Sequence, residues 1–169
     1  MITIRNEQVG DAPAIHAIHR AAFPTDVEAR LVDRLRANGH ACVPLVAEAD
    51  TVLAGHVLFS PVSIADHPDC HSGLGLAPIG VLPSYQRAGI GSKLIVEGLA
   101  TCRQAGYPFV VVLGHPAYYP RFGFRRASVL GLTNAYGADE AFMVMELSPG
   151  SLPAEGGLVK YGTEFAELG

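Results

Sequence analysis

The hydrophobic and polar positions change period along the chain, and each change predicts an element. Ile2–Arg5 alternates as a short strand does. Two stretches with apolar residues at helical spacing follow, Asp11–Phe23 and Thr25–Asn38. In the second stretch, Thr25 and Glu28 have the spacing of a capping box. The first part of the chain therefore predicts a strand followed by two amphipathic helices.

The period becomes that of strands in the middle of the chain. Val43–Glu48 and Thr51–Ser60 form a predicted hairpin, and a polar loop over Ile64–Ser72 leads to the apolar run Gly73–Val81. This run is typical of a buried strand, although Pro78 cannot donate a hydrogen bond to a ladder. We therefore expect an edge or a bulge at Pro78.

The last third alternates between helical and strand patterns. We expect a helix at Gly89–Gln104, a strand at Phe109–Leu113, a helical turn at Ala117–Phe122 and a strand at Ala141–Leu147. A linker at Ser148–Gly157 leads to a tail at Leu158–Leu168, which either adds one strand or covers a groove. A strand–helix–strand order implies a parallel crossover, whereas the hairpin implies antiparallel neighbours. The element order thus predicts an α/β fold with a mixed sheet and helices on both faces. We expect residues 1–147 to form one domain and residues 148–169 to be a linker and tail packed on it.

Composition excludes several classes of protein. The chain has 169 residues, 49% of them hydrophobic and 17% charged, which is too apolar for a disordered chain. The net charge is −4 and there is no basic stripe, so we expect no nucleic-acid partner. We find no signal peptide and no apolar stretch of ~18 residues, so we expect a cytoplasmic protein without a membrane partner. Three widely spaced cysteines in such a chain predict reduced thiols.

Glycine is the residue type in excess, with 19 copies, and several of them lie around a loop that enters a helix. The loop runs from the end of the strand at Val81 to the helix that begins near Gly89. Successive backbone N–H groups at a helix N-terminus bind phosphate oxygens, and glycine lets the anion approach closely. The Rossmann pattern fails because Leu94 stands where it needs a third glycine, and the P-loop pattern fails because Ser92-Lys93 is inverted. Neither of these two phosphate-binding patterns therefore fits the loop.

The loop resembles the coenzyme A pyrophosphate loop of the GNAT-type N-acetyltransferases. Gln86–Gly91 reads QRAGIG, which matches the pattern Q/R-x-x-G-x-G/A of that superfamily. Downstream, the run Tyr119–Phe124 is similar to the superfamily's Tyr-x-x-x-Gly-Phe segment, and Leu113–Phe124 resembles a bacterial branch of it. The order of elements over residues 2–147 is also that of the GNAT fold. The resemblance implies a twisted mixed sheet that splays between its fourth and fifth strands.

The resemblance also implies how acetyl-CoA, the co-substrate, would be held. In this fold the pantetheine arm lies in the splayed gap, where the strand offers unpaired backbone groups. The residues that correspond are Ile79, Gly80 and Val81 for the pantetheine and Gln86, Arg87, Ala88, Gly89, Ile90, Gly91 and Ser92 for the pyrophosphate. Three arginines have two possible roles: they contact the coenzyme's 3′-phosphate, or they lie on a face exposed to solvent. The sequence does not distinguish the two roles for Arg121, Arg125 and Arg126.

The implied reaction is direct attack of an amine on the thioester. Tyr119 matches the tyrosine that protonates the departing thiolate, and a backbone N–H near Val81 is the expected oxyanion donor. Many relatives use a glutamate on the fourth strand as the base, but Gly73–Val81 has no acidic residue. Glu28, His56 and a chain of waters are the candidates for that role.

Structural roles compete with several of these hypotheses. Tyr119 could be an aromatic packing residue, Tyr118 is expected in the core, Glu28 could be a cap, and His56 is more simply a hydrogen-bonded structural residue. His16 and His19 at i,i+3, and the run His67–His71, have ligand residue types without structural zinc spacing. We expect a solvated helix face and a polar loop there, and no metal.

The sequence therefore predicts an acetyltransferase that moves an acetyl group from acetyl-CoA to a primary amine of a small molecule or peptide. The alternative is a non-catalytic acyl-CoA-binding or regulatory module of the same fold, which the missing strand glutamate favours. The resemblance places the acceptor pocket at Phe23–Arg30, Ile64–Ser72 and the tail. These segments do not specify the acceptor, and both a monomer and a homodimer are compatible with the sequence.

Overall fold

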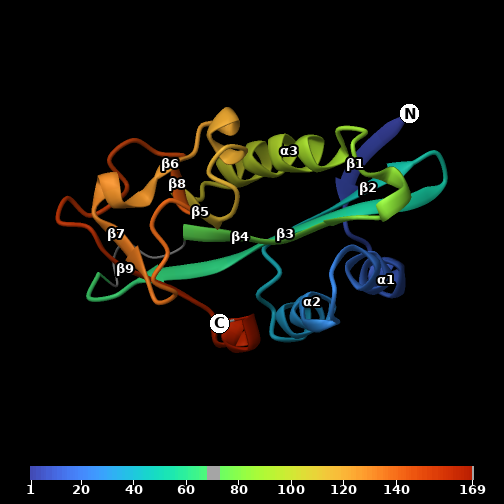
Figure 1. The fold of residues 1–169 in the computed structure, drawn as a ribbon, viewed down its shortest axis with the longest axis horizontal. Helices are drawn as coiled ribbons and strands as arrows, with labels where there is room; N and C mark the ends of the chain where they lie inside the picture. The colour runs from blue at the N-terminus through green and yellow to red at the C-terminus, as the bar shows by residue number, and fades with distance from the viewer. Residues whose placement is uncertain (68–72, 169) are drawn as a thin grey trace.

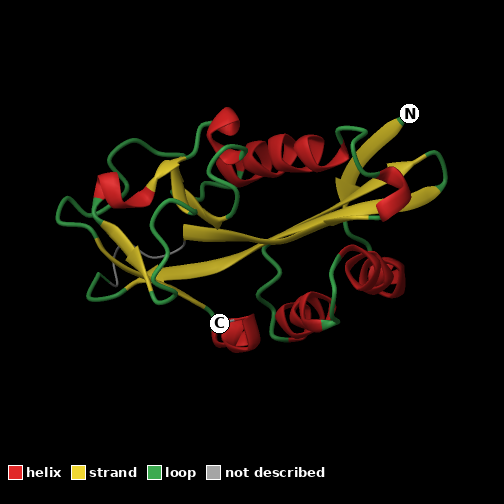
Figure 2. Ribbon diagram, viewed as in Figure 1, coloured by secondary structure: helices red, strands yellow, loops and turns green. Residues whose placement is uncertain are grey.

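The computed structural model describes residues 1–67 and 73–168. One long helix and two shorter ones lie against a twisted sheet (Figures 1 and 2). In chain order, the strands and α-helices are β1 (Ile2–Asn6), α1 (Ala12–Ala22), α2 (Val27–Ala37), β2 (Val43–Ala49), β3 (Val52–Ile64), β4 (Gly73–Val81), α3 (Ile90–Gln104), β5 (Phe109–Leu113), β6 (Arg125–Arg126), β7 (Leu132–Asn134), β8 (Phe142–Glu146) and β9 (Gly157–Tyr161). Short 3₁₀ turns lie between several of them, η3 (Tyr119–Phe122) among them, and η5 (Thr163–Leu168) follows β9.

The sheet is mixed, as the sequence predicts. Its strand order is β1-β2-β3-β4-β5-β8-β6, with β9 paired to both β3 and β7. In the main path β4 and β5 are parallel and the other neighbours are antiparallel. Helix α3 covers one face, and α1 and α2 cover the other (Figure 1). The predicted α/β class with helices on both faces is confirmed.

β4 separates from β5 after a short paired stretch. Only Leu74 and Gly75 of β4 have β5 partners, so the part of β4 that follows Gly75 is unpaired on that side. Toward β3, the register jumps so that a single residue, Leu58, faces both Ala77 and Pro78. The expected irregularity at Pro78 is therefore a bulge, which suits a residue that cannot donate to the ladder.

Apolar stripes attach the helices to both faces of the sheet. Leu94, Ile95 and Leu99 of α3 are buried against strand residues that include Phe59. On the other face Ile15, Leu31 and Leu35 of α1 and α2 pack against Val46 and Leu58, in a cluster that also holds Phe165 of η5. The C-terminal segment is therefore part of the packing that fixes α1 and α2.

The structure corrects the predicted start of the second helix. α2 begins at Val27 with Asp26 as its N-cap, and no side chain caps it. The Thr25 hydroxyl accepts a long hydrogen bond of 3.4 Å from the Val27 N–H instead. The predicted capping box is therefore wrong, and Glu28 has no capping role.

Two short strands of the C-terminal region and the end of β3 were not predicted. β6 and β7 are too short to leave a period in the sequence, and β3 continues four residues past its predicted end, to Ile64. That extension is paired with β9, in which Tyr161 faces Val62 and Val159 faces Ile64. The tail thus adds a strand, one of the two alternatives that its sequence allowed. No helix in the described residues is long and apolar enough to cross a membrane.

Candidate active site

The loop before α3 has the backbone shape of an anion site. Arg87 and Gly89 both have left-handed backbone conformations, with φ of 66° and 81°. α3 begins directly after Gly89, which is its N-cap. Left-handed residues in a turn direct consecutive N–H groups into a concavity, and the helix dipole adds positive potential there. Arg87 is strained in this conformation, a feature that is typical of functional loops.

A cavity of about 280 Å³ lies over this loop. The lining residues come from the end of β4, the loop, the first turn of α3 and the segment before η3: Val81, Tyr85, Gln86, Arg87, Gly89, Ile90, Gly91, Ser92 and Tyr118. None of these described residues is acidic, and Arg87 adds a cationic side chain. The cavity therefore suits a phosphate group. Six of the seven residues expected to hold the pyrophosphate line it, and Ala88 is exposed in the same loop.

Gln86 ties the loop to the strand that precedes it. Its side-chain amide donates a hydrogen bond of 3.1 Å to the carbonyl oxygen of Val81. The contact closes the turn between β4 and α3 from the side. In this chain, the first residue of the loop motif therefore links the loop to the end of β4.

A second cavity, of about 250 Å³, continues from the first. The two share Val81, Gln86, Gly91 and Tyr118, and the second is also lined by Ala22, Phe23, Ile79, Gly80, Ile95 and Tyr119. It follows the part of β4 that has no β5 partner, where backbone N–H and C=O groups are available to an amide-bearing ligand. The pair of cavities thus forms a path from the loop before α3 to the middle of the sheet. All three residues expected at the pantetheine arm lie along this path.

The two tyrosines at the start of η3 have different surroundings. Tyr119 is buried, packs edge-on against Phe124, and lines the second cavity. Burial, with a smaller contribution from Tyr118, raises the pKa of Tyr119 to about 12. Its hydroxyl is therefore protonated at neutral pH and able to donate a proton.

Tyr118 is not the core residue that the sequence predicted. It is only half-buried and lines both cavities. Its hydroxyl and that of Ser92 form a hydrogen bond of 2.8 Å, which joins the segment before η3 to the first turn of α3. The guanidinium of Arg121 lies 4.7 Å from the centre of its ring, an arrangement that keeps a cation beside the cavity. The sequence carried no signal for this pairing, because Ser92 and Tyr118 are 26 residues apart.

The structure separates the two side chains considered as a base. Glu28 is half-buried at the start of α2, and its Oε1 has no hydrogen-bond partner among the described residues. It is not among the described residues that line either cavity. His56 is completely buried and hydrogen-bonded to His19 and Glu7, as expected of a structural histidine.

His19 departs from its predicted environment. A solvated helix face was expected for His16 and His19, but His19 is completely buried between α1 and the sheet. His16 is half-buried, and its Nδ1 lies 2.8 Å from an Asp33 oxygen. The prediction of a solvated face is therefore wrong for His19 and only partly right for His16, because the side of α1 that carries His19 packs against β3 and β4.

Most of the run His67–His71 lies outside the described residues. Within the described residues, no group of three or more His, Cys, Asp or Glu could hold a metal.

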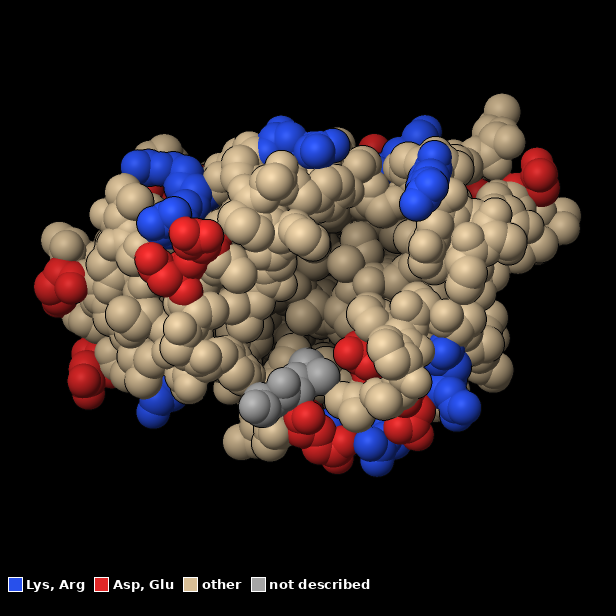
Figure 3. Space-filling model, viewed as in Figure 1, with Lys and Arg blue, Asp and Glu red and all other residues tan. Residues whose placement is uncertain are grey.

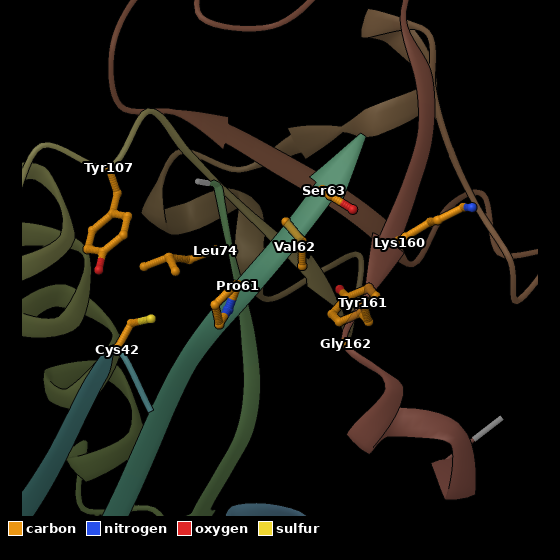
Figure 4. Close-up of a pocket in the computed structure, with 9 residues that line it drawn as sticks. All are labelled: Cys42, Pro61, Val62, Ser63, Leu74, Tyr107, Lys160, Tyr161 and Gly162. Atoms are coloured by element: carbon orange, nitrogen blue, oxygen red, sulfur yellow. The ribbon is translucent and has the colours of Figure 1, made fainter. Parts of the chain in front are cut away.

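A third cavity, of about 470 Å³, lies elsewhere on the sheet (Figure 4). It opens at Pro61, where β3 changes its partner from β2 to β9. Cys42 and Tyr107 lie on one side of β3 and Tyr161 on the other, and the Lys160 ammonium points away (Figure 4). It shares no lining residue with the other two cavities, so it is a separate cavity.

In the face of the molecule shown in Figure 3, charged side chains lie at the rim of the central hollow, and uncharged residues form its interior.

Comparison with known proteins identifies the family. Residues 3–127 match the family described as acetyltransferase (GNAT) domain. The chain belongs to the GNAT acetyltransferases. It is 39% identical over 164 residues to the N-acetyltransferase YhbS of Escherichia coli K12, a match that covers 96% of this chain and 97% of YhbS.

Solved structures of GNAT proteins show the same fold. The crystal structure of E. coli YhbS in complex with CoA has a TM-score of 0.92 and 38% sequence identity, and the match covers 99% of this chain and 93% of that one. A GNAT acetyltransferase from Brucella melitensis, in complex with acetyl-CoA, has a TM-score of 0.81 and 38% identity, with 98% of both chains covered. The predicted GNAT fold and acetyltransferase class are confirmed.

Proposed function

We propose that this GNAT acetyltransferase moves the acetyl group of acetyl-CoA to a primary amine of a small molecule or peptide. The observation that carries the proposal is the continuous path of two cavities from the loop at Arg87 and Gly89 to Tyr119. The path has a phosphate-binding end and an end with a buried proton donor. CoA and acetyl-CoA, the ligands in the YhbS and Brucella structures, have a phosphate end and a thioester end.

The residues along the path suit the coenzyme. The N–H groups of the loop and the hydroxyl of Ser92 would bind the pyrophosphate, with Gln86 holding the loop closed. The unpaired edge of β4 at Ile79, Gly80 and Val81 would bond the amides of the pantetheine. When bound, the coenzyme supplies the activated thioester.

In the proposed reaction the amine nitrogen attacks the thioester carbonyl carbon, and the carbon–sulfur bond breaks. The Tyr119 hydroxyl gives its proton to the leaving thiolate, so that CoA departs as a thiol, and Tyr119 recovers a proton from solvent. The acceptor enters as an ammonium ion and loses two protons as it becomes an amide. We propose that water in the cavity carries these protons, since no described residue that lines it is acidic and Glu28 does not reach it. One proton is released in total.

The test is a thiol-release assay with acetyl-CoA and a panel of primary amines that includes polyamines, amino acids, aminoglycosides and peptides. The expected result is CoA release that depends on both the enzyme and one class of amine, with the acetylated product identified by mass spectrometry. Acetyl-CoA that binds with micromolar affinity while no amine in the panel is acetylated would contradict the proposal. That outcome would favour the non-catalytic coenzyme-binding module.

A further inference from the structure

Two hydroxyl groups meet where the two connected cavities join. The hydroxyls of Ser92 and Tyr118 lie 2.8 Å apart and are hydrogen-bonded to each other. Both residues are half-buried, and both line the cavity over the loop before α3. Tyr118 also lines the second cavity, together with Tyr119. The hydroxyl pair is therefore accessible to a ligand that extends through both cavities.

The side chain of Tyr118 is held at its ring as well as at its hydroxyl. The ring packs edge-on against the rings of Tyr119 and Phe122, with centroids 5.2 Å apart in both pairs. The Arg121 guanidinium lies 4.7 Å from the centre of the same ring. A ring that is packed in this way keeps its hydroxyl in one place, which lowers the entropy cost of binding a ligand there.

The Tyr118 hydroxyl lies close to the first turn of α3. A Cβ atom at Gly91 would lie 3.9 Å from the hydroxyl oxygen. The first hydrogen bond of α3 runs from the Lys93 N–H to the Gly89 carbonyl, so the three N–H groups before it have no partner within the helix. Tyr118 approaches this turn from the segment that follows β5. A ligand at the turn would thus meet N–H groups on one side and the Tyr118 hydroxyl on the other.

The two hydroxyls together keep one O–H group that can bind a ligand. Each hydroxyl has one proton, and each can both donate and accept a hydrogen bond. One of the two protons lies between Ser92 and Tyr118, whichever residue is the donor. The other proton can be donated to a third atom, and the bond within the pair polarises it, which makes it a stronger donor. The pair therefore suits an anionic oxygen in the cavity.

We propose that the Ser92–Tyr118 hydroxyl pair binds the phosphate group next to the pantetheine of the coenzyme, which makes Tyr118 a further coenzyme-binding residue. The proposal rests on the function proposed above, in which the pyrophosphate lies over the loop and the pantetheine lies along β4. Tyr118 lines both cavities, so the group beside it is the one at which these two parts of the coenzyme meet. That group is the phosphate bonded to the pantetheine. The phosphate next to the adenosine lies farther along the loop, out of reach of the pair.

Two fragments of coenzyme A separate its two pyrophosphate groups. Phosphopantetheine has the phosphate next to the pantetheine, and adenosine 3′,5′-bisphosphate has the phosphate next to the adenosine. NMR titration measures the affinities of the fragments, and isothermal titration calorimetry measures that of CoA. We expect Tyr118→Phe and Ser92→Ala each to weaken the binding of CoA and phosphopantetheine by the same factor of about ten. The affinity for adenosine 3′,5′-bisphosphate should stay within about twofold of wild type.

Tyr136→Phe is the matched control for the loss of a phenol hydroxyl. Tyr136 is 40% exposed and is not among the described residues that line the two cavities. The control should bind all three ligands as the wild type does. Urea unfolding of every variant shows whether the bond between Ser92 and Tyr118 also supports the fold.

Two results would overturn the proposal. Wild-type affinity for phosphopantetheine in Tyr118→Phe would show that its hydroxyl does not bind that phosphate, whatever happens to adenosine 3′,5′-bisphosphate. Equal losses for all three ligands, in step with a loss of stability, would make the pair only a structural link between α3 and the segment before η3.

Failure of the proposed function gives a different result. A wild-type protein that binds CoA and acetylates no amine would refute acetyl transfer, while the selective loss of phosphopantetheine binding would still support the role of Tyr118. A wild-type protein that does not bind CoA would refute both. All of these readouts are binding measurements, so they do not depend on finding the acceptor.

Discussion

The proposed coenzyme-binding loop before α3 allows a quantitative prediction, because the chain contains a matched pair of glycines. Gly89 begins α3 with φ of 81°, and Gly106 follows its C-terminal end with φ of 87°. At both positions an added Cβ would meet nothing within 4 Å. Both Gly→Ala substitutions therefore cause the same backbone strain without a steric clash inside the protein.

The size of the strain follows from the backbone conformation. An L-residue in the left-handed region costs about 1–2 kcal/mol, so Gly89→Ala and Gly106→Ala should each lower the free energy of unfolding by roughly that amount. Only Gly89 lies in the cavity over the loop. There, the strain shifts the loop away from its binding shape, and the new methyl group occupies space that a phosphate would need. We expect acetyl-CoA binding to weaken at least tenfold, or about 1.4 kcal/mol, in Gly89→Ala alone.

Isothermal titration calorimetry with acetyl-CoA, combined with urea unfolding of the same preparations, measures both effects. Gly106→Ala is the control for strain, because it should lose stability without losing affinity. Equal acetyl-CoA affinity in the two variants would refute the assignment of this loop to the coenzyme. A large loss of stability in Gly89→Ala only would refute the reasoning from strain.

Three further predictions test other parts of the protein. Tyr119→Phe should lower kcat about 100-fold or more, with acetyl-CoA affinity within twofold of wild type, because the thiolate loses its proton donor. The variant to compare it with is Tyr118→Phe, at the neighbouring position. An unchanged kcat in Tyr119→Phe would exclude the catalytic role of Tyr119. Burial raises the pKa of Glu7, but hydrogen bonds from His56 and Arg36 outweigh it and hold that pKa at about 2 in the fold. The pKa is 4.5 in the unfolded chain, so the contribution of Glu7, roughly 3 kcal/mol, is present above pH 4.5 and lost as the pH falls toward 2. Urea unfolding from pH 6 to pH 2 should therefore show a flatter decline for Glu7→Gln, and parallel curves for the variant and the wild type would contradict the linkage. Gly98→Ala should lower the free energy of unfolding by about 1–3 kcal/mol, because its Cβ would overlap the buried ring of Phe59; a variant as stable as wild type in the same urea assay would show that Phe59 can move.

The sequence predicted elements with a strong local signal. The helix that ends at Gln104 begins one residue later than expected, at Ile90. The strand Phe109–Leu113 has the bounds that were predicted. Both have dense apolar patterns whose period is set by local backbone geometry. The turn before α3 was also readable, because a glycine in a left-handed conformation directly before a helix is a local feature of the sequence.

Contacts between distant residues escaped sequence reasoning. Tyr118 was expected in the core, but its hydrogen bond to Ser92 places it at the rim of both cavities. His19 was expected in solvent, although the rotation of α1 about its axis places it on the sheet. Glu28 had the spacing of a cap and is not one. Each error concerns the direction of a side chain, which packing decides and spacing does not.

The sequence by itself determined the order of the elements as far as β5, the glycine-bearing turn before α3 and the family, since each depends on residues close together along the chain. Only the tertiary structure decided which polar groups meet. The hydrogen-bonded series Arg36, Glu7, His56 and His19 joins α2, the segment after β1, β3 and α1. The physical reason is that hydrogen bonds form only across a few ångströms. Folding brings His19 and His56, which are 37 positions apart, and Glu7 and His56, which are 49 positions apart, within that distance.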